Sequence, residues 1–231
     1  MYGLLITFSI LASALFLEKQ LKKEQKSLDT FWGLVFWTVL TGVIGARLYH
    51  VLDNFEVYKA NPVMVFEVWR GGLGILGGIL FGLAGAVAYL KYKKEPVVEW
   101  LDKIAVFIPF IQSASRWGNF FNNELYGKET TLPWGIYVSQ ENAKVHPLFL
   151  YESLLNATLF IFLLRLSTKN LKKGSITASY LIGYSIIRLF LEEFKLNPWH
   201  IAGLNVAQLI SILIILGSIV FLTYELKHKS Y

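Results

Sequence analysis

The amino-acid sequence predicts an all-α polytopic membrane protein with about seven transmembrane helices, and three observations support this fold class. Hydrophobic residues make up 55% of the 231 residues and charged residues only 16%, whereas about 25% of the residues in a soluble domain are charged. The hydrophobic residues form blocks of roughly twenty, the length that crosses a hydrocarbon core about 30 Å thick. Basic residues gather in alternate connections between these blocks, as expected of a chain that crosses a membrane repeatedly.

The hydrophobic blocks give the helices in chain order. We expect them at about residues 2–18, 32–51, 72–90, 101–115, 147–165, 175–191 and 206–224. The first block begins at Met1 but lacks the basic start and small-residue cleavage site of a signal peptide, so we interpret it as a retained helix.

The distribution of basic residues predicts the orientation. Fourteen of the 22 lysines and arginines fall on one side of this arrangement, namely Lys19, Lys22, Lys23, Lys26, Lys91, Lys93, Lys94, Lys103, Arg165, Lys169, Lys172, Lys173, Lys227 and Lys229. Cytoplasmic loops carry the excess of basic residues in membrane proteins. The N-terminus is therefore predicted outside and the C-terminus in the cytoplasm.

The sequence contains no internal repeat and no low-complexity linker, so we treat residues 1–231 as one domain. Its longest connection, residues 116–146, is expected to form a small extracytoplasmic head loop with a strand-like stretch at residues 134–138. A second outer loop covers residues 52–71. Long ordered loops of this kind often carry function.

Composition also excludes several kinds of chemistry. The chain has no cysteine, which rules out disulfides, thiolate metal sites and a cysteine nucleophile of its own. No two histidines have metal-ligand spacing, so we expect neither a metal nor a cofactor. The net charge of +6 fits cytoplasmic loops held against anionic lipid better than it fits nucleic-acid binding.

Three predicted helices each have an arginine near their outer end. These are Arg47, Arg116 and Arg188. An arginine at membrane depth is costly and is a functional hypothesis by default. One such arginine could snorkel to the interface or pair with an acid, but three at one depth favour an anion site, because the guanidinium fork suits phosphate. Tyr184 lies four residues before Arg188 and shares its helix face.

The densest polar stretch, residues 115–127, reads Ser-Arg-Trp-Gly-Asn-Phe-Phe-Asn-Asn-Glu-Leu-Tyr-Gly. By composition alone it fits a capped helix end with satisfied amides. It also resembles the signature G-R-x-G-N-F-x-N-x-E-x-x-G of the bacterial prolipoprotein diacylglyceryl transferases, with Ser115 in place of the first glycine. Further matches to this family lie along nearly the whole chain, at residues 2–4, Gly45-Ala-Arg47, residues 132–137, His146-Pro147, Tyr151-Glu152, residues 182–184, Arg188, Glu192, Gln208 and Ser211.

The resemblance implies a multi-pass enzyme of the bacterial inner (cytoplasmic) membrane. Its substrates would be phosphatidylglycerol and the signal peptide of a prolipoprotein, whose lipobox cysteine attacks C3 of the glyceryl group. A thioether forms and glycerol-1-phosphate leaves, the first step of lipoprotein maturation. Implied catalytic residues are Arg116, Arg188, Tyr184 and Glu124. Implied substrate-binding residues are Tyr2, Arg47, Asn119, Asn122, Gly127, His146, Glu152 and Gln208.

One departure from the family concerns the general base. Many members have histidine before a glycine pair in the third helix, where this chain has Leu76. Three routes for the thiol proton stay open: Glu124, His146, or thiolate stabilisation by the arginines with water as acceptor. A non-catalytic lipid-binding homologue and a small transporter remain as alternatives to the transferase.

Overall fold

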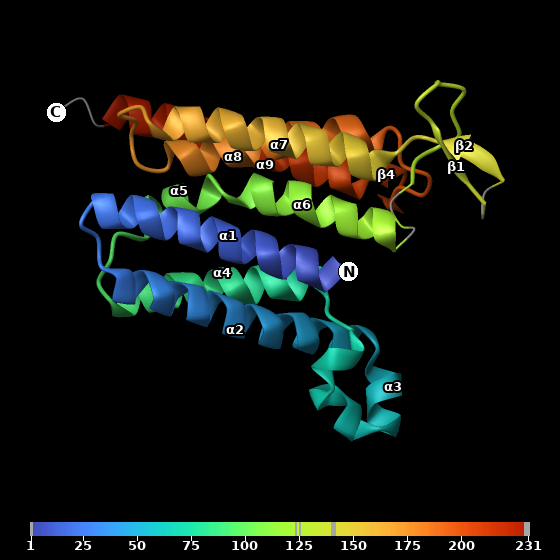
Figure 1. Cartoon of the computed structure of the whole chain (residues 1–231), viewed down its shortest axis with the longest axis horizontal. Helices are drawn as coiled ribbons and strands as arrows, with labels where there is room; N and C mark the ends of the chain where they lie inside the picture. The colour runs from blue at the N-terminus through green and yellow to red at the C-terminus, as the bar shows by residue number, and fades with distance from the viewer. Residues whose placement is uncertain (1, 123, 125, 140–141, 229–231) are drawn as a thin grey trace. The chain divides into compact units, whose positions relative to one another are not determined.

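The computed structural model describes residues 2–122, 124, 126–139 and 142–228, without the side chains of Tyr2 and residues 225–228. Most described residues are helical (Figure 1). The chain divides into two compact units. We call Glu18–Val97 the α2–α4 unit, and we call Met1–Leu17 together with Val98–Tyr231 the α5–α9 unit.

The α2–α4 unit contains α2 (Leu28–Asp53), α3 (Phe55–Ala60), the short 3₁₀ helices η1 (Pro62–Phe66) and η2 (Val68–Arg70), and α4 (Ile75–Tyr92). The helix α1 (Tyr2–Lys23) begins in the other unit and ends in this one. The α5–α9 unit contains α5 (Val97–Ala105), α6 (Ile108–Phe121), β1 (Ile136–Val138), β2 (Ala143–Val145), α7 (Leu148–Ser167), α8 (Ser175–Glu192), β3 (His200–Ile201), β4 (Leu204–Asn205) and α9 (Val206–His228).

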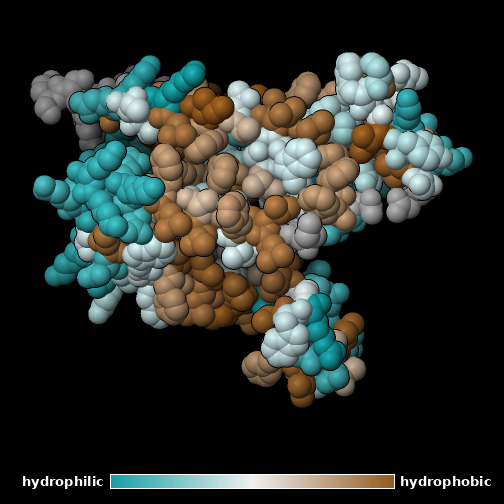
Figure 2. Space-filling model, viewed as in Figure 1, coloured by the Kyte–Doolittle hydropathy of each residue, from teal (hydrophilic) through white to brown (hydrophobic). Residues whose placement is uncertain are grey.

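Within the described residues, five helices are long and apolar enough to cross a membrane: α1, α2, α4, α7 and α9. Large side chains such as Phe36 and Leu52 are exposed along them. In the α2–α4 unit, hydrophobic residues cover the helices, and hydrophilic residues gather at the turns after α1 and α4 (Figure 2). The chain is therefore a polytopic helical membrane protein, as its composition predicted.

The predicted fourth helix, residues 101–115, was wrong as a single element. It is divided between α5 and α6, with a turn at Val106 and Phe107. Pro109 lies at the start of α6 and has no N–H to bond the carbonyl of Ala105, so an unbroken helix would lose a hydrogen bond and strain the ring. Helix α6 also continues to Phe121, which places Arg116 inside the helix instead of at its end.

Helices α2 and α4 pack closely because glycines lie between them. A Cβ added at Gly45 would come within 2.6 Å of the Gly77 carbonyl oxygen, and one at Gly82 within 3.3 Å of the Thr38 carbonyl oxygen. The backbone N–H of Gly74 donates to the carbonyl of Ala46 at 2.8 Å and fixes the start of α4 against α2. The glycines of α2 and α4 thus permit close helix packing.

In the α5–α9 unit, α6 packs on α7, α7 on α8 and α8 on α9. Asp102 of α5 caps the start of α8, because its carboxylate accepts from the backbone N–H groups of Gly174 at 2.6 Å and Thr177 at 2.8 Å. The hairpin of β1 and β2 pairs Ile136 with Val145 and lies where α6 ends and α7 begins (Figure 1). The predicted strand at residues 134–138 is thus present over its last three residues.

Candidate functional site

Arg116 of α6 is held against Glu152 of α7. The guanidinium Nη2 lies 2.8 Å from Glu152 Oε1, an ion-pair contact to a side chain that is only 2% exposed. Two hydrogen bonds fix the helices in this register. Ser113 Oγ donates to the carbonyl of Ser153 at 2.8 Å, and Trp117 Nε1 donates to Ser153 Oγ at 3.1 Å.

Arg188 of α8 approaches the same carboxylate from the other side. Its Nη1 lies 4.0 Å from Glu152 Oε2, and its Nη2 lies 3.0 Å from Glu192 Oε2. Lys195, just beyond α8, reaches the other oxygen of Glu192 at 3.5 Å. Because Glu192 follows Arg188 by four residues, one turn of α8 presents both groups on one face.

The structure therefore brings two of the three predicted arginines together around one buried acid. We call Arg116, Glu152, Arg188 and Glu192 the arginine–carboxylate cluster. Tyr184 lies one turn before Arg188 on the same face of α8. A guanidinium carries five donors, so it can bind a phosphate while a carboxylate holds it in place.

The signature loop continues from this cluster. Asn119 is buried, and its Oδ1 accepts from Arg116 Nη1 at 3.2 Å. Its Nδ2 donates to Glu124 Oε2 at 3.2 Å, while the backbone N–H of Glu124 donates to the Asn119 carbonyl at 2.8 Å. Asn119 thus links Glu124, which is exposed and is one of the predicted bases, to Arg116. Asn122 caps the end of α6; Asn123 and Leu125 lie outside the described residues.

Gly127 and His146 join the head loop to the end of α8. A Cβ at Gly127 would come within 2.8 Å of both His146 Cβ and the Phe194 carbonyl oxygen, so only glycine fits without a shift. His146 Nδ1 lies 3.2 Å from the Tyr151 hydroxyl, and its ring packs on Phe194 with centroids 5.0 Å apart. These contacts hold the His146 ring against Tyr151 and Phe194, and its part in substrate binding stays a prediction.

Two further predicted substrate-binding residues have less structural context. Gln208 of α9 donates from Nε2 to Glu193 Oε1 at 2.6 Å, just after α8. The side chain of Tyr2 lies outside the described residues.

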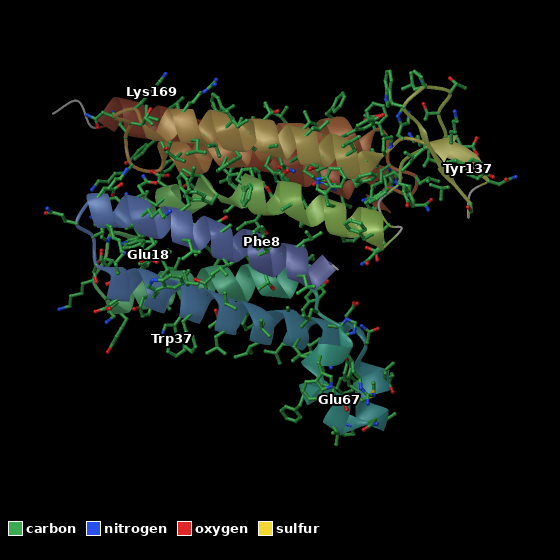
Figure 3. The ribbon with its side chains drawn as sticks, in the orientation of Figure 1. Phe8, Glu18, Trp37, Glu67, Tyr137 and Lys169 are labelled. Atoms are coloured by element: carbon green, nitrogen blue, oxygen red, sulfur yellow. The ribbon has the colours of Figure 1, made fainter. Side chains whose placement is uncertain are left out.

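Arg47 lies in the α2–α4 unit, where backbone carbonyls surround its guanidinium. Nε donates to Val65 at 2.9 Å and Nη1 donates to Gly71 at 2.7 Å. The remaining acceptors are the carbonyls of Met64, Glu67 and Gly72. Glu67, labelled in Figure 3, belongs to the same segment between α3 and α4, and the ring of Tyr58 lies 5.1 Å from the guanidinium carbon.

Arg47 therefore orders the segment between α3 and α4, satisfying carbonyls that would otherwise stay unbonded near the membrane. Gly71 and Gly72 both have positive φ, at 89° and 72°, which turns their carbonyls toward Arg47. The participation of Arg47 in substrate binding stays a prediction.

Sequence reasoning did not single out Glu192 as a site residue and did not foresee that Glu152 joins the two arginines. The i,i+4 spacing of Arg188 and Glu192 was the available signal for the first contact. No local signal existed for the second, because Glu152 lies 36 positions after Arg116 in the sequence.

Fold and site together define a polytopic helical membrane protein with a cluster of arginines and carboxylates contributed by α6, α7 and α8. The family model for prolipoprotein diacylglyceryl transferase matches residues 1–224. The chain belongs to this family, and the resemblance inferred from the motifs is confirmed.

Curated relatives cover nearly all of the chain. It is 37% identical to the phosphatidylglycerol–prolipoprotein diacylglyceryl transferase of Clostridium botulinum, over 99% of this chain and 93% of the relative. It is 36% identical to the enzyme of the same name from Finegoldia magna, over 99% and 90%. It is 37% identical to that from Fervidobacterium nodosum, over 93% and 77%.

Proposed function

We propose that the chain transfers the diacylglyceryl group of phosphatidylglycerol to the lipobox cysteine of prolipoproteins. The thiolate sulfur forms a bond to C3 of the glyceryl group, the C3–O bond breaks, and glycerol-1-phosphate leaves with the bonding electrons. The thiol proton goes to a base or to water. The observation that carries this proposal is the arginine–carboxylate cluster, found in a member of a family named for this transfer.

The electrostatics of the cluster suit the reaction. A phosphodiester that becomes a phosphomonoester gains negative charge as the leaving group departs, and donors placed in advance stabilise that charge. Arg116 and Arg188 supply such donors, and Glu152 holds them in place before substrate arrives. Tyr184 is proposed to hydrogen-bond the lipid beside Arg188. A protein without cysteine fits this scheme, since the substrate brings the nucleophile.

The remaining site assignments are proposals of the same kind. Glu124 is proposed as a catalytic residue linked through Asn119 to Arg116. The proposed substrate-binding residues are Tyr2, Arg47, Asn119, Asn122, Gly127, His146, Glu152 and Gln208.

We further propose seven spans in the bacterial inner membrane, with the N-terminus outside and the C-terminus cytoplasmic. The α5–α6 pair and α8 would be the two spans beyond the five most apolar helices. A cysteine introduced at Lys128 should then react with a membrane-impermeant maleimide from the outside, without background because the chain has no cysteine. Cysteine at Lys94 is the matched control and should react only after the membrane is opened. The reverse pattern would contradict this orientation.

The general base can be sought through the pH dependence of transfer. If Glu124 accepts the thiol proton, the low-pH limb of the wild-type pH–rate profile should depend on this side chain. Glu124→Gln should then lose most of the rate together with this low-pH limb. Glu129→Gln, which changes an exposed carboxyl in the same segment, is the control. An unchanged profile in Glu124→Gln, with His146→Gln inactive but folded, would assign the base to His146.

The decisive experiment is a transfer assay with purified protein, phosphatidylglycerol and a lipobox peptide. The proposal expects a diacylglyceryl thioether on the peptide and one equivalent of glycerol-1-phosphate. Phosphatidylglycerol binding without thioether formation would identify a non-catalytic lipid-binding protein instead. Movement of a solute across vesicles without thioether formation would identify a transporter.

A further inference from the structure

A second polar level lies beside the arginine–carboxylate cluster. Gln112 precedes Arg116 by four residues on α6, and Tyr180 precedes Tyr184 by four residues on α8. Gln112 Nε2 donates to the Tyr180 hydroxyl at 3.0 Å, which closes this level between the two helices. The rings of Tyr180 and Tyr184 are stacked, with centroids 6.0 Å apart and planes 18° apart.

This second level lies further from the head loop than the arginines do, which in the proposed topology is deeper in the membrane. Helix α6 runs toward the head loop, which begins after Phe121, and α8 ends where Lys195 bridges to Gly127 of that loop. Gln112 and Tyr180 therefore lie about 6 Å, or one helical turn, further from the head loop than Arg116 and Tyr184.

The pair of side chains has more hydrogen-bonding capacity than one interhelical bond uses. In the orientation described, the second N–H of Gln112 and the O–H of Tyr180 remain available as donors. If the amide is turned over, Tyr180 donates to Gln112 and both N–H groups remain available, so either orientation leaves two donors. Within the described residues, Gln112 Oε1 is buried without a hydrogen-bond partner.

We propose that Gln112 and Tyr180 bind an ester carbonyl of the diacylglyceryl group during transfer, an inference that rests on the proposed function. With the phosphate at Arg116 and Arg188, the two ester groups lie on the other two glycerol carbons, one bonded to the phosphate-bearing C3 and one a carbon further away, and their acyl chains extend into the bilayer. An ester carbonyl accepts hydrogen bonds and donates none, which matches the donors that Gln112 and Tyr180 present. The pair thus selects acyl chains joined by esters.

The competing explanation is an interhelical hydrogen bond that only holds α6 against α8, a common device in membrane proteins. The two explanations differ in their response to the lipid. If Gln112 and Tyr180 bind an ester, replacing either one slows transfer only from a lipid that has an ester carbonyl. A purely structural role lowers transfer from every lipid by the same factor.

The test compares diacyl and dialkyl phosphatidylglycerol of equal chain length, since the ether-linked lipid keeps the phosphate and headgroup but lacks both carbonyls. We expect wild-type kcat/KM to favour the diester by about tenfold, the effect of one buried hydrogen bond. Tyr180→Phe and Gln112→Leu should lower kcat/KM for the diester by about tenfold and leave the diether unchanged. Tyr92→Phe, which removes an exposed hydroxyl at the end of α4, should keep the preference.

Equal use of both lipids by the wild type would overturn the inference, with the proposed transfer still standing. The inference also fails if the variants slow transfer from both lipids by one factor. If the wild-type protein transfers a group from neither lipid, the proposed function is overturned, and the ester site with it. Because the first comparison needs only the wild-type protein, a variant that folds poorly does not leave the question open.

Discussion

Arg116→Ala is expected to lower diacylglyceryl transfer by about a thousandfold, the cost of losing a donor that stabilises developing charge. Arg116→Lys is expected to recover little of this loss. Lysine keeps the positive charge beside Glu152, but it lacks the planar fork that contacts two phosphate oxygens together. The measurement is kcat/KM with phosphatidylglycerol and a lipobox peptide, accompanied by thermal unfolding of each purified variant.

Arg165→Ala and Arg165→Lys serve as matched controls, because Arg165 is an exposed arginine at the end of α7. Both should transfer at close to the wild-type rate. Near-normal turnover by well-folded Arg116→Ala would remove Arg116 from the catalytic role. Full activity of Arg116→Lys would instead show that a single positive charge is sufficient at this position.

The positions of the helices could be predicted from the sequence because membrane helices need long apolar blocks, and such blocks are visible in a single chain. Six of the seven predicted segments each correspond to one helix, with α4 beginning three residues later than predicted, and the fourth is divided between α5 and α6. The interruption at Pro109 was missed because apolar residues continue on both sides of it, so composition alone gives one block. The proline itself was the signal, as its ring disfavours an uninterrupted helix.

The site was predictable only in part, and the three arginines show why. The depth of a residue follows from its place along a helix, so Arg116 and Arg188 could be expected at one level. Neighbours around the helix axis depend on how helices pack, which a single sequence does not reveal. The partners of Arg47 are backbone carbonyls of residues 64–72, and no residue type marks a carbonyl that will turn toward a guanidinium.

Glu152 offers a way to separate the structural contribution of the cluster from its chemistry. Glu152→Leu is expected to lower the free energy of unfolding by about 3 kcal/mol, because it leaves Arg116 without the buried carboxylate that faces it. Arg188 loses only a 4.0 Å contact and keeps Glu192 at 3.0 Å. Adding Arg116→Met replaces the ion pair by apolar side chains of similar size, a change that is often neutral or stabilising.

The double variant Glu152→Leu with Arg116→Met is therefore expected to regain most of the lost stability but none of the lost transfer. Thermal unfolding in detergent measures the first quantity and the lipobox-peptide assay measures the second. Arg165→Met, at an exposed position of α7, is the control for replacing an arginine by methionine away from the cluster. Recovery of transfer in the double variant would mean that the ion pair only supports the fold. Recovery of stability without recovery of transfer would mean that the Arg116–Glu152 pair is required for the transfer reaction itself. Arg116 would then act on the substrate, and Glu152 would serve transfer by holding Arg116 in place.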